Sequence, residues 1–400
     1  MKKIIKKSTF LFLLFSIISY SNPAKQSIKK NRTTTSNTEF KCGADNYEKY
    51  LPLLSNKKVG IVSNQTGILA NKMHLVDFLL EKKISVQKIF SPEHGFRGTA
   101  DAGEHVLDEK DAKTGLPIIS LYGVNHKPKA DQLDGIDVMI FDLQDVGVRF
   151  YTYIYTLHRV MEACAENNIP LILLDRPNPN GAIIDGPILD TAYSSGIGMH
   201  PTPVLHGMTI GEYGKMINGE KWLKNKVQCE LIVIPCVNYN RKMEYSLPVK
   251  PSPNLPNDQS INLYASLCFF EGTNVSMGRG TEKQFQIYGS PFLAKENFSY
   301  SFTPKPNFGA KDPTHNGIEC FGEDLSSYQK LTRLELKWLI KAYQNTSDKS
   351  KFFNPFFTKL AGTKKLQQQI ENGTSENKIR QSWKNGLTEF KKMRTKYLIY

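Results

Sequence analysis

Between about residues 57 and 234, short runs of apolar, often β-branched residues alternate with stretches whose apolar positions recur at helical spacing. The short runs predict six strands, at residues 59–63, 86–90, 118–121, 138–141, 171–174 and 231–234. The helical spacing predicts helices at residues 74–83, 153–167 and 210–218. Because the strand runs are apolar throughout and do not alternate with polar residues, we expect a parallel sheet covered by helices on both faces. The pattern therefore predicts a Rossmann-like α/β domain.

Local signals refine this prediction at two points. Thr209 precedes the third predicted helix and Glu212 follows three residues later, which is the spacing of a capping box. The first strand leads into Asn64-Gln65-Thr66-Gly67, and the G-x-G-x-x-G pattern that binds dinucleotides does not occur there. We therefore expect no nucleotide cofactor.

Beyond about residue 235 the composition and the spacing of apolar residues change. Residues 251–256 and 302–317 are rich in Pro, Asn and Gly, and helical spacing returns at residues 325–343, 363–372 and 375–397. We predict a smaller α+β domain at 236–400 that closes a cleft against a Rossmann-like domain at 43–235. The four phenylalanines of residues 351–360 are expected to be core residues: Phe352, Phe353, Phe356 and Phe357.

The N-terminus has the organisation of a secretory signal. Four lysines lie within the first seven residues, an apolar stretch covers residues 10–18, and small residues follow at 19–21. We predict a signal peptide at 1–21, a flexible leader at 22–42, and a mature protein in the periplasm or outside the cell. The apolar stretch is shorter than the roughly 20 residues of a spanning helix, and we expect no membrane span after cleavage.

Charge and cysteine content exclude some classes of function. Loss of the four signal lysines lowers the formal charge from +14 to +10, spread along the chain, and no nucleic-acid-binding motif accompanies it. A nucleic-acid partner is therefore not expected. The six cysteines lack metal-binding spacings, so a metal site is not expected either. Cys164 and Cys268 have the surroundings of buried apolar residues.

Polar clusters follow four of the predicted strands. They occupy residues 64–67, 91–98, 142–151 and 175–179. The carboxyl ends of parallel strands share one edge of a sheet, where open α/β sheets bind ligands. Amides, carboxylates, arginines and aromatic rings gathered there suit a sugar, with hydrogen bonds for its hydroxyls and apolar faces for its ring. Asp142 and Asp175 fit a helix cap or a salt bridge with a neighbour equally well, and Arg149 and Arg176 fit structural roles equally well.

A further cluster follows in the predicted second domain. Residues 270–281 combine Glu271, Asn274 and Arg279 with three glycines, which indicates backbone lying close to a ligand. Glu271 is positioned to pair with Glu93 of the 91–98 loop, and Arg279 could neutralise an anionic substituent.

These motifs together resemble the NamZ-type exo-β-N-acetylmuramidases. The resemblance rests on SNQTG at 63–67, FSPEHGFRG at 90–98, FDLQDVG at 141–147 with RFYTY at 149–153, LDRPNP at 174–179, and EGTN at 271–274 with GRGT at 278–281. Trp383 and the closing KYLIY at 396–400 extend it to the C-terminus.

The resemblance implies an exported glycoside hydrolase that releases N-acetylmuramic acid from the non-reducing ends of peptidoglycan fragments. From the chemistry of glycoside hydrolysis we predict Glu93 as general acid and Glu271 as its partner carboxylate, with Asp145 in reserve. The 2-acetamido group of the substrate could instead act as nucleophile. The predicted substrate-binding residues are Asn64, His94, Arg97, Gln144, Arg149, Tyr151, Asn254, Asn274 and Arg279.

Two other classes of function share parts of this pattern. A non-catalytic binding protein for wall sugars also places a sugar-sized cleft between two α/β lobes. A nicotinamide-dependent glycosidase would also have a Rossmann-like domain, but the missing glycine fingerprint disfavours it. The oligomeric state does not follow from the sequence.

Overall fold

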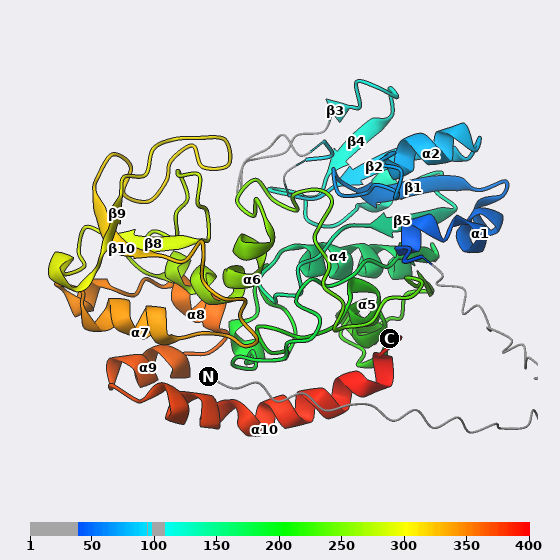
Figure 1. Cartoon of the computed structure of the whole chain (residues 1–400). Helices are drawn as coiled ribbons and strands as arrows, with labels where there is room; N and C mark the ends of the chain where they lie inside the picture. Colours follow the sequence, from blue (N-terminus) through cyan, green and yellow to red (C-terminus); the bar gives the residue numbers. More distant parts are fainter. Residues whose placement is uncertain (1–38, 94, 98–108) are drawn as a thin grey trace, which may run out of the picture. The chain divides into compact units, whose positions relative to one another are not determined.

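The structure is a computed structural model that describes residues 39–93, 95–97 and 109–400 (Figure 1). Residues Glu39–Tyr400 form one compact unit by their internal contacts. The predicted signal peptide, most of the predicted leader and His94 lie outside the described residues. Within the described part of the chain, no helix is both long enough and apolar enough to cross a membrane.

A seven-stranded sheet forms the larger half of this unit, in the spatial order β3-β4-β2-β1-β5-β6-β7. Its strands are β1 (Lys58–Ser63), β2 (Ser85–Ser91), β3 (Glu109–Lys110), β4 (Pro117–Ser120), β5 (Val138–Asp142), β6 (Leu171–Leu174) and β7 (Leu231–Ile234). All pairs are parallel except that of β3 with β4. The six predicted strands are confirmed, whereas the exposed two-residue β3 carries no apolar signal and was not predicted.

The order of the parallel strands is that of a doubly wound sheet. The chain runs outward from β1 through β2 to β4, then returns to β5 on the other side of β1 and continues outward to β7. The strand order therefore reverses between β1 and β5, and the crevice beyond the carboxyl ends at such a point is where this fold binds ligands. The predicted Rossmann-like α/β class is confirmed.

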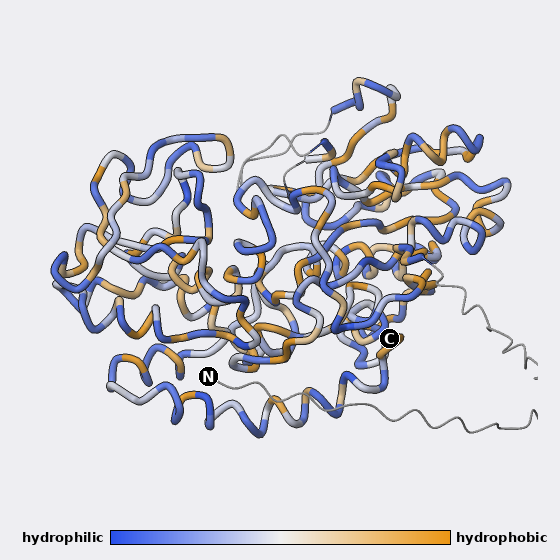
Figure 2. The backbone as a smooth tube through the Cα atoms, viewed as in Figure 1, coloured by the Kyte–Doolittle hydropathy of each residue, from blue (hydrophilic) through white to orange (hydrophobic). Residues whose placement is uncertain are grey.

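Both faces of the sheet are buried, as the continuous apolar strands predict. Val59 and Ile61 of β1 belong to one core cluster with residues of α1 (Tyr47–Tyr50) and α2 (Leu75–Glu81). Val62 belongs to a second cluster with residues of α4 (Tyr153–Glu166) and α5 (Ile210–Gly219). The short helix α3 (Ala130–Leu133) follows β4. The apolar strands show as orange segments within the sheet in Figure 2.

The predicted capping box at α5 is confirmed. The Thr209 side chain accepts a hydrogen bond from the Glu212 backbone N–H, and the Glu212 side chain accepts one from the Thr209 backbone N–H. These bonds satisfy two of the N–H groups that the start of a helix leaves unpaired.

The smaller half contains a three-stranded antiparallel sheet and several helices. The sheet has the order β8-β10-β9, with β8 (Ile287–Ser290), β9 (Tyr300–Phe302) and β10 (Cys320–Asp324). The helices are α6 (Asp258–Leu267), α7 (Lys337–Gln344), α8 (Phe356–Ala361), α9 (Lys365–Glu371) and α10 (Glu376–Arg394). The predicted domain boundary at 235 stays a prediction.

The helix predicted at 325–343 is wrong in its first half, because only Lys337–Gln344 is helical. The backbone N–H groups of Leu331, Leu334 and Glu335 donate instead to the side chains of residues elsewhere in the fold. Their acceptors are Asn262, Asp185 and Ser266. These tertiary hydrogen bonds replace the local bonds of a helix.

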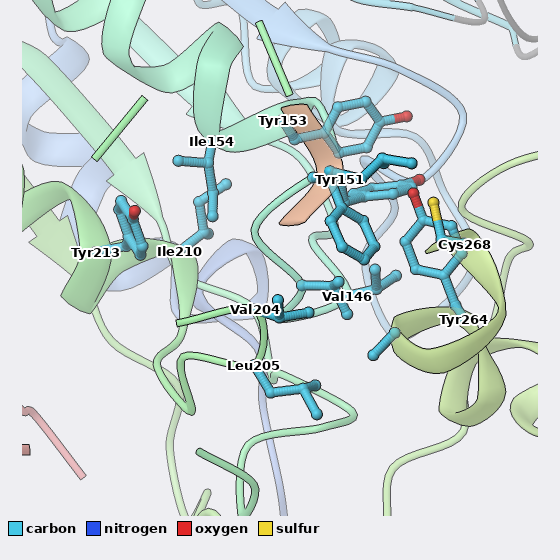
Figure 3. Close-up of a cluster of buried hydrophobic side chains, with 14 of the residues drawn as sticks. Val146, Tyr151, Tyr153, Ile154, Val204, Leu205, Ile210, Tyr213, Tyr264 and Cys268 are labelled. Carbon is cyan, nitrogen blue, oxygen red and sulfur yellow. The ribbon is translucent and has the colours of Figure 1, made fainter. Parts of the chain in front are cut away.

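The core continues from the larger sheet into the smaller half (Figure 3). The Tyr151 ring meets the Tyr264 ring of α6 edge to face, with centroids 6.0 Å apart. Phe150 meets Phe269 of the 3₁₀ helix η5 (Cys268–Gly272) in the same way at 5.8 Å. Cys164 and Cys268 are buried, as predicted, and all six cysteines are free thiols.

Candidate active site

A cavity of about 640 Å³ lies between loops at the carboxyl end of the large sheet and segments of the smaller half. Its lining residues are Glu93, Tyr122, Phe150, Thr152, Ile197, Tyr264, Glu271, Arg279, Gly309, Ala310, Lys311, Asp312, Pro313, Thr314 and Phe356. Glu93, Tyr122 and Thr152 follow β2, β4 and β5, which are parallel strands whose carboxyl ends share one edge. The cavity therefore brings together the two predicted catalytic glutamates, Glu93 and Glu271.

The Glu93 carboxylate is hydrogen-bonded to groups from two other strand-end loops. The Thr152 hydroxyl donates to Glu93 Oε2 at 2.9 Å. Burial, the negative charge of Glu93 and a hydrogen bond to its carboxylate raise the pKa of Tyr122, so the phenol stays protonated and donates. Glu93 and Tyr122 lie two residues beyond the ends of β2 and β4, and Thr152 immediately precedes α4.

Glu271 and Arg279 also line the cavity and form an ion pair, with Arg279 Nη2 2.7 Å from Glu271 Oε1. Burial alone would lower the pKa of Arg279, but the Glu271 charge and hydrogen bond outweigh it and the pKa is raised. The pair is about one quarter exposed, at 24% for Glu271 and 25% for Arg279. Both side chains therefore remain accessible from the cavity.

The glycines on either side of Arg279 are required by the backbone. Gly278 and Gly280 have φ angles of +86° and +79°, which side chains with a Cβ atom rarely adopt. A Cβ on Gly280 would also lie 2.6 Å from Pro313, a residue of the cavity wall. The glycine-rich cluster thus allows the Arg279 turn to pack directly on the 309–314 segment.

Asn254, a predicted substrate contact, holds this wall from behind. Its Nδ2 donates to the Gly309 carbonyl at 2.6 Å, and its side chain is buried. Asn274 lies outside the cavity lining, with its backbone bonded to Phe352, Ser290 and His315. Phe356, which we expected in the core, instead lines the cavity, whereas Phe352 and Phe357 are fully buried.

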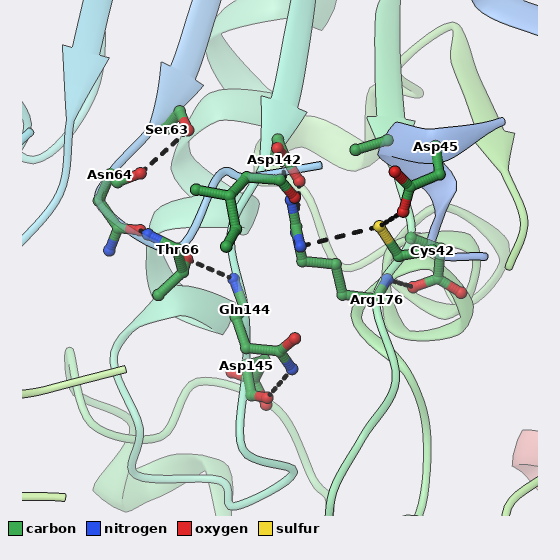
Figure 4. Close-up of polar contacts among 12 residues, drawn as sticks. Cys42, Asp45, Ser63, Asn64, Thr66, Asp142, Gln144, Asp145 and Arg176 are labelled. Carbon is green, nitrogen blue, oxygen red and sulfur yellow. Dashed lines mark hydrogen bonds and ion pairs between the residues drawn. The ribbon is translucent and has the colours of Figure 1, made fainter. Parts of the chain in front are cut away.

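The predicted ligands Asn64 and Gln144 lie in a buried network beyond β1 and β5 (Figure 4). Asn64 Nδ2 donates to the Tyr153 hydroxyl at 2.5 Å, and Gln144 Nε2 donates to the Asp145 and Pro177 carbonyls. The crevice at the point of strand reversal is therefore filled by the protein's own side chains. The cavity lies beside it, toward the smaller half.

Tyr151 and Asp145 are also buried behind the cavity. The Tyr151 hydroxyl donates to the Pro251 carbonyl at 2.7 Å. Asp145 Oδ1 accepts from the Gly147 N–H at 2.6 Å, while Oδ2 has no hydrogen-bond partner among the described residues. Burial raises the pKa of Asp145 to about 7. Neither side chain is part of the cavity lining.

The arginines divide between structural and site roles. Arg149 is buried, and its guanidinium donates to the carbonyls of Pro187, Thr202, Leu360 and Ala361. Arg97 makes a forked contact with Asp111 at 2.8 and 3.0 Å and does not line the cavity. Of the arginines that we predicted to bind substrate, Arg279 is therefore the one that reaches this cavity.

Asp142 and Arg176 take the structural alternative that the sequence left open. Arg176 makes two contacts with the Asp142 carboxylate, at 2.6 and 2.9 Å, and both side chains are buried. Asp175 accepts hydrogen bonds from Thr209 Oγ1, the Gly211 N–H and the Tyr400 hydroxyl. These contacts join the strand ends to α5 and to the C-terminus.

Sequence reasoning missed Tyr122, Thr152, Phe150 and the 309–314 wall as site residues. Thr152 and Phe150 lie in a motif quoted for the resemblance, in the segment between β5 and α4, and that motif was the available signal. The 309–314 segment carried only the composition of a loop, because its place in the wall depends on tertiary contacts. Among the described residues, no group of three or more His, Cys, Asp or Glu could hold a metal ion.

A doubly wound sheet with two carboxylates and a guanidinium in one cavity defines a class of α/β proteins equipped to act on polar ligands such as sugars. Family models identify the particular family. The N-terminal model of exo-beta-N-acetylmuramidase NamZ matches residues 59–259, and its C-terminal model matches residues 262–400. The chain belongs to the NamZ exo-beta-N-acetylmuramidase family, which is a family of glycoside hydrolases.

Individual relatives agree with this assignment. The chain is 38% identical to the peptidoglycan beta-N-acetylmuramidase NamZ of Bacillus subtilis (strain 168), over 99% of this chain and 100% of that protein. A crystal structure of a DUF1343 family protein from Bacteroides fragilis NCTC 9343 superposes with a TM-score of 0.84 at 45% identity, covering 91% of this chain and 99% of that one. A second such protein from the same strain gives 0.75 at 26% identity, covering 90% and 99%.

Proposed function

We propose that this protein is an exo-acting glycoside hydrolase that releases N-acetylmuramic acid from the non-reducing ends of peptidoglycan fragments. The observation that carries the proposal is the placement of Glu93 and Glu271 in the lining of one cavity. Glycoside hydrolysis uses such a pair of carboxyl groups, one to protonate the leaving oxygen and one to support the cationic centre. The family and the Bacillus relative supply the substrate class.

The ion pair suggests how the two roles are divided. Arg279 beside Glu271 favours the charged carboxylate, which suits the group that stabilises an oxocarbenium-like centre or orients the 2-acetamido group. Glu93 contacts hydroxyl groups that can both donate and accept, which suits a group that gives up a proton during the reaction. We assign Glu93 as general acid and Glu271 as its partner.

Arg279 has a second role in this proposal. Muramic acid carries a lactyl carboxylate, and a guanidinium can bind a substrate carboxylate while it also contacts a protein carboxylate, because it has five N–H donors. Only one of these donors is directed to Glu271. Arg279 would thereby distinguish muramic acid from glucosamine at the non-reducing end.

We also propose that the mature protein acts outside the cytoplasm, after removal of the predicted signal at 1–21. The support is the order of basic, apolar and small residues in that segment. Determination of the N-terminal residue of the protein recovered from its native host would test this, and an intact Met1 would contradict it.

The experiment for the activity compares Glu93→Gln and Glu271→Gln on a chromogenic β-N-acetylmuraminide. Each variant should lose roughly 10²- to 10⁴-fold in kcat, the usual contribution of a positioned proton donor or charged partner. Glu323→Gln is the matched control, because Glu323 pairs with Lys341 at 2.6 Å, is 26% exposed and lies outside the cavity lining. Near wild-type turnover by a folded Glu93 or Glu271 variant would remove that residue from the mechanism.

Product analysis on defined MurNAc-GlcNAc oligomers tests the exo polarity. Release of free N-acetylmuramic acid from the non-reducing end alone is expected. Internal cleavage would contradict exo action. Tight binding of muramyl ligands without any hydrolysis by the wild-type protein would favour the binding-protein alternative.

A further inference from the structure

The Glu93 carboxylate is contacted by two hydroxyl groups, those of Thr152 and Tyr122. Thr152 Oγ1 lies 2.9 Å from Glu93 Oε2, and the Tyr122 phenol forms a second hydrogen bond with the same side chain. Thr152 and Tyr122 follow different strands, β5 and β4, and both line the cavity. Glu93 is therefore held from two directions by groups whose positions the sheet determines.

The Thr152 hydroxyl does not cap the helix that follows it, as far as the described residues show. Thr152 immediately precedes α4, where a threonine side chain often caps the helix. Here its backbone is already helical, with φ −73° and ψ −9°, and its side chain makes no capping hydrogen bond. The hydroxyl is directed to Glu93 instead, which points to a role in the site.

We propose that Thr152 and Tyr122 are positioning residues for Glu93, and that their hydroxyls stabilise the negative charge which remains on Glu93 after proton transfer. The proposal rests on the assignment of Glu93 as general acid. In the step concerned, the Glu93 proton moves to the glycosidic oxygen, the bond from that oxygen to C1 breaks, and the leaving sugar departs as an alcohol. The carboxylate formed then accepts both hydrogen bonds.

Stabilisation of this kind accelerates the reaction because it is stronger in the transition state than in the ground state. A hydroxyl donates a stronger hydrogen bond to a carboxylate than to a neutral carboxyl group. The amino end of α4 adds in the same direction, since its first turn contains no acidic residue and its dipole favours a negative charge.

Other charged and titratable groups face the same space and enter any pH dependence. Tyr153 contributes from α4, and its pKa is raised by burial and, further, by the Glu93 charge. Glu271, Arg279, Lys311 and Asp312 line the same cavity and contribute as well. Variants at Thr152 and Tyr122 leave all five of these groups unchanged.

The test uses substitutions that remove a hydroxyl and little else. Thr152→Val keeps the shape of the side chain, Thr152→Ser keeps the hydroxyl, and Tyr122→Phe removes the phenol oxygen alone. Thr152→Val and Tyr122→Phe should each lower kcat roughly 10-fold, the effect of losing one hydrogen bond to a charged group, with KM within about 2-fold of wild type. Thr152→Ser should recover most of the rate.

The pH profile provides the readout that a structural defect would not move. Without a donor to the carboxylate, Glu93 holds its proton more strongly, so the fall of kcat/KM on the alkaline side should move to higher pH. Tyr155→Phe is the control, since Tyr155 lies on α4 outside the cavity lining. A uniform loss of rate at every pH, or unchanged kcat in a folded Thr152→Val variant, would overturn the proposal.

Failure of the proposed function can be told apart from failure of this inference. If the wild-type protein hydrolyses no muraminide, the activity itself is wrong. A crystal structure of Thr152→Val then still tests the contact, because the Glu93 carboxylate should leave its position if the hydroxyl holds it. An unmoved carboxylate would count against the positioning role whatever the activity.

A second inference rests on an exposed aromatic ring at the edge of the cavity. Phe308 is 64% exposed and immediately precedes Gly309, the first residue of the 309–314 wall. It lies in a tight turn closed by two backbone hydrogen bonds between Asn307 and Ala310, each 3.1 Å long. Asn254 and Thr281 anchor this turn, through the Gly309 carbonyl and the Asn307 side chain respectively.

A ring left in water on a firmly anchored turn beside a polar cavity is suited to contact a ligand. An exo-acting enzyme holds one sugar in its cavity, and the rest of the saccharide extends past the edge. We infer that Phe308 stacks on the sugar that follows the scissile bond, with the apolar face of its pyranose ring against the phenyl ring. This inference also rests on the proposed function, whose substrate it specifies.

The test compares a disaccharide with a substrate that lacks the second sugar. Phe308→Ala should lower kcat/KM for MurNAc-GlcNAc roughly 10-fold and leave kcat/KM for methyl β-N-acetylmuraminide nearly unchanged. Phe308→Trp keeps an aromatic ring and should restore kcat/KM for MurNAc-GlcNAc. Leu53→Ala is the control, because Leu53 is 42% exposed on a 3₁₀ helix of the larger half. Equal losses on both substrates, or no loss on either, would overturn the inference.

A binding measurement keeps this inference separate from hydrolysis. In the Glu93→Gln background, calorimetry should show that Phe308→Ala weakens binding of MurNAc-GlcNAc but leaves binding of N-acetylmuramic acid unchanged. That result would support the stacking contact even if the wild-type protein proved to be inactive. Unchanged disaccharide binding would contradict it.

Discussion

Arg279 Nη2 and Glu271 Oε1 are 2.7 Å apart across a turn that two glycines with positive φ make possible. The pair places one negative and one positive group side by side on the same cavity wall. A substrate with its own carboxylate can therefore meet the guanidinium without leaving Glu271 unpaired. This relationship predicts how the site selects its sugar.

Arg279→Met should raise KM for a chromogenic β-N-acetylmuraminide by roughly 10-fold or more, because a charge-assisted hydrogen bond to the lactyl carboxylate is lost. The matching β-N-acetylglucosaminide lacks that carboxylate, so its KM should change little in Arg279→Met. Arg333→Met, at an exposed arginine outside the cavity, serves as the control. An equal increase in KM for the two substrates would show that Arg279 does not bind the lactyl carboxylate.

The buried pair of Asp142 and Arg176 should dominate local stability at the strand ends. Arg176→Met leaves the Asp142 carboxylate buried without its partner and should cost about 3–5 kcal/mol in the free energy of unfolding. Glu244→Gln removes an exposed pair with Lys330, in which the two side chains are 87% and 58% exposed, and should cost less than about 1 kcal/mol. Urea denaturation of both variants measures the difference.

Asp145 should make the protein less stable as pH rises. Burial raises its folded pKa to about 7, against 3.8 as the ordinary value, so the folded state holds a proton that the unfolded state has released between these pH values. The free energy of unfolding should therefore fall from about pH 4 to pH 7, by roughly 4 kcal/mol in total.

Asp145→Asn should remove this slope, because an amide cannot ionise and its oxygen can still accept from the Gly147 N–H. Urea denaturation at pH 5 and at pH 8 measures the free energy of unfolding of variant and wild type, and the difference between them should change between the two pH values. Asp175, whose pKa burial raises to about 6, contributes to both proteins and cancels. A difference in stability between variant and wild type that is the same at pH 5 and at pH 8 would contradict the prediction.

The hydrogen bonds of the C-terminal tyrosine should stabilise the folded protein. The Tyr400 hydroxyl donates to Asp175 Oδ2 at 2.7 Å and accepts from the Cys236 N–H at 2.7 Å. Tyr400→Phe leaves both partners short of a hydrogen bond and should cost roughly 1–3 kcal/mol, visible as a lower Tm. Tyr47→Phe, at an exposed tyrosine, should leave Tm unchanged.

The six thiols should be unreactive in the folded protein. All are buried, and burial raises the pKa of Cys229 and Cys320 to about 12. Little thiolate is present at neutral pH, and the sulfur atoms are shielded. Ellman's reagent should label none rapidly in buffer and all six in 6 M guanidinium chloride. Rapid labelling of the native protein would place a thiol at the surface.

The spacing of apolar residues along the chain predicted most helices and strands of the larger half. Apolar strands such as Leu171–Leu174 are buried on both faces, so their composition alone indicates a covered parallel sheet. The capping box of Thr209 and Glu212 is local and was therefore readable. The segment before α7 was misread, because Leu331, Leu334 and Glu335 give their backbone N–H groups to distant side chains.

The sequence predicted only part of the candidate site, again because contacts between distant residues decide the rest. Glu93, Glu271 and Arg279 stand in motifs whose residue types suit the chemistry, and the structure brings them to one cavity. Asn64, Gln144 and Arg149 stand in equally polar motifs, yet the structure buries them in contacts with the protein itself. The side chains of both groups are polar, and what separates the groups is the set of atoms that each side chain contacts.

The sequence by itself determined the doubly wound half and the polar strand ends, because strand, helix and cap signals act over a few residues. Tertiary structure alone decided which polar groups face a ligand and which face one another. It placed the Thr152 hydroxyl on Glu93 and the 309–314 segment in the lining of the same cavity, since such contacts join residues far apart in the chain. Whether a polar side chain is satisfied by its own protein depends on these distant neighbours, and no local pattern records them.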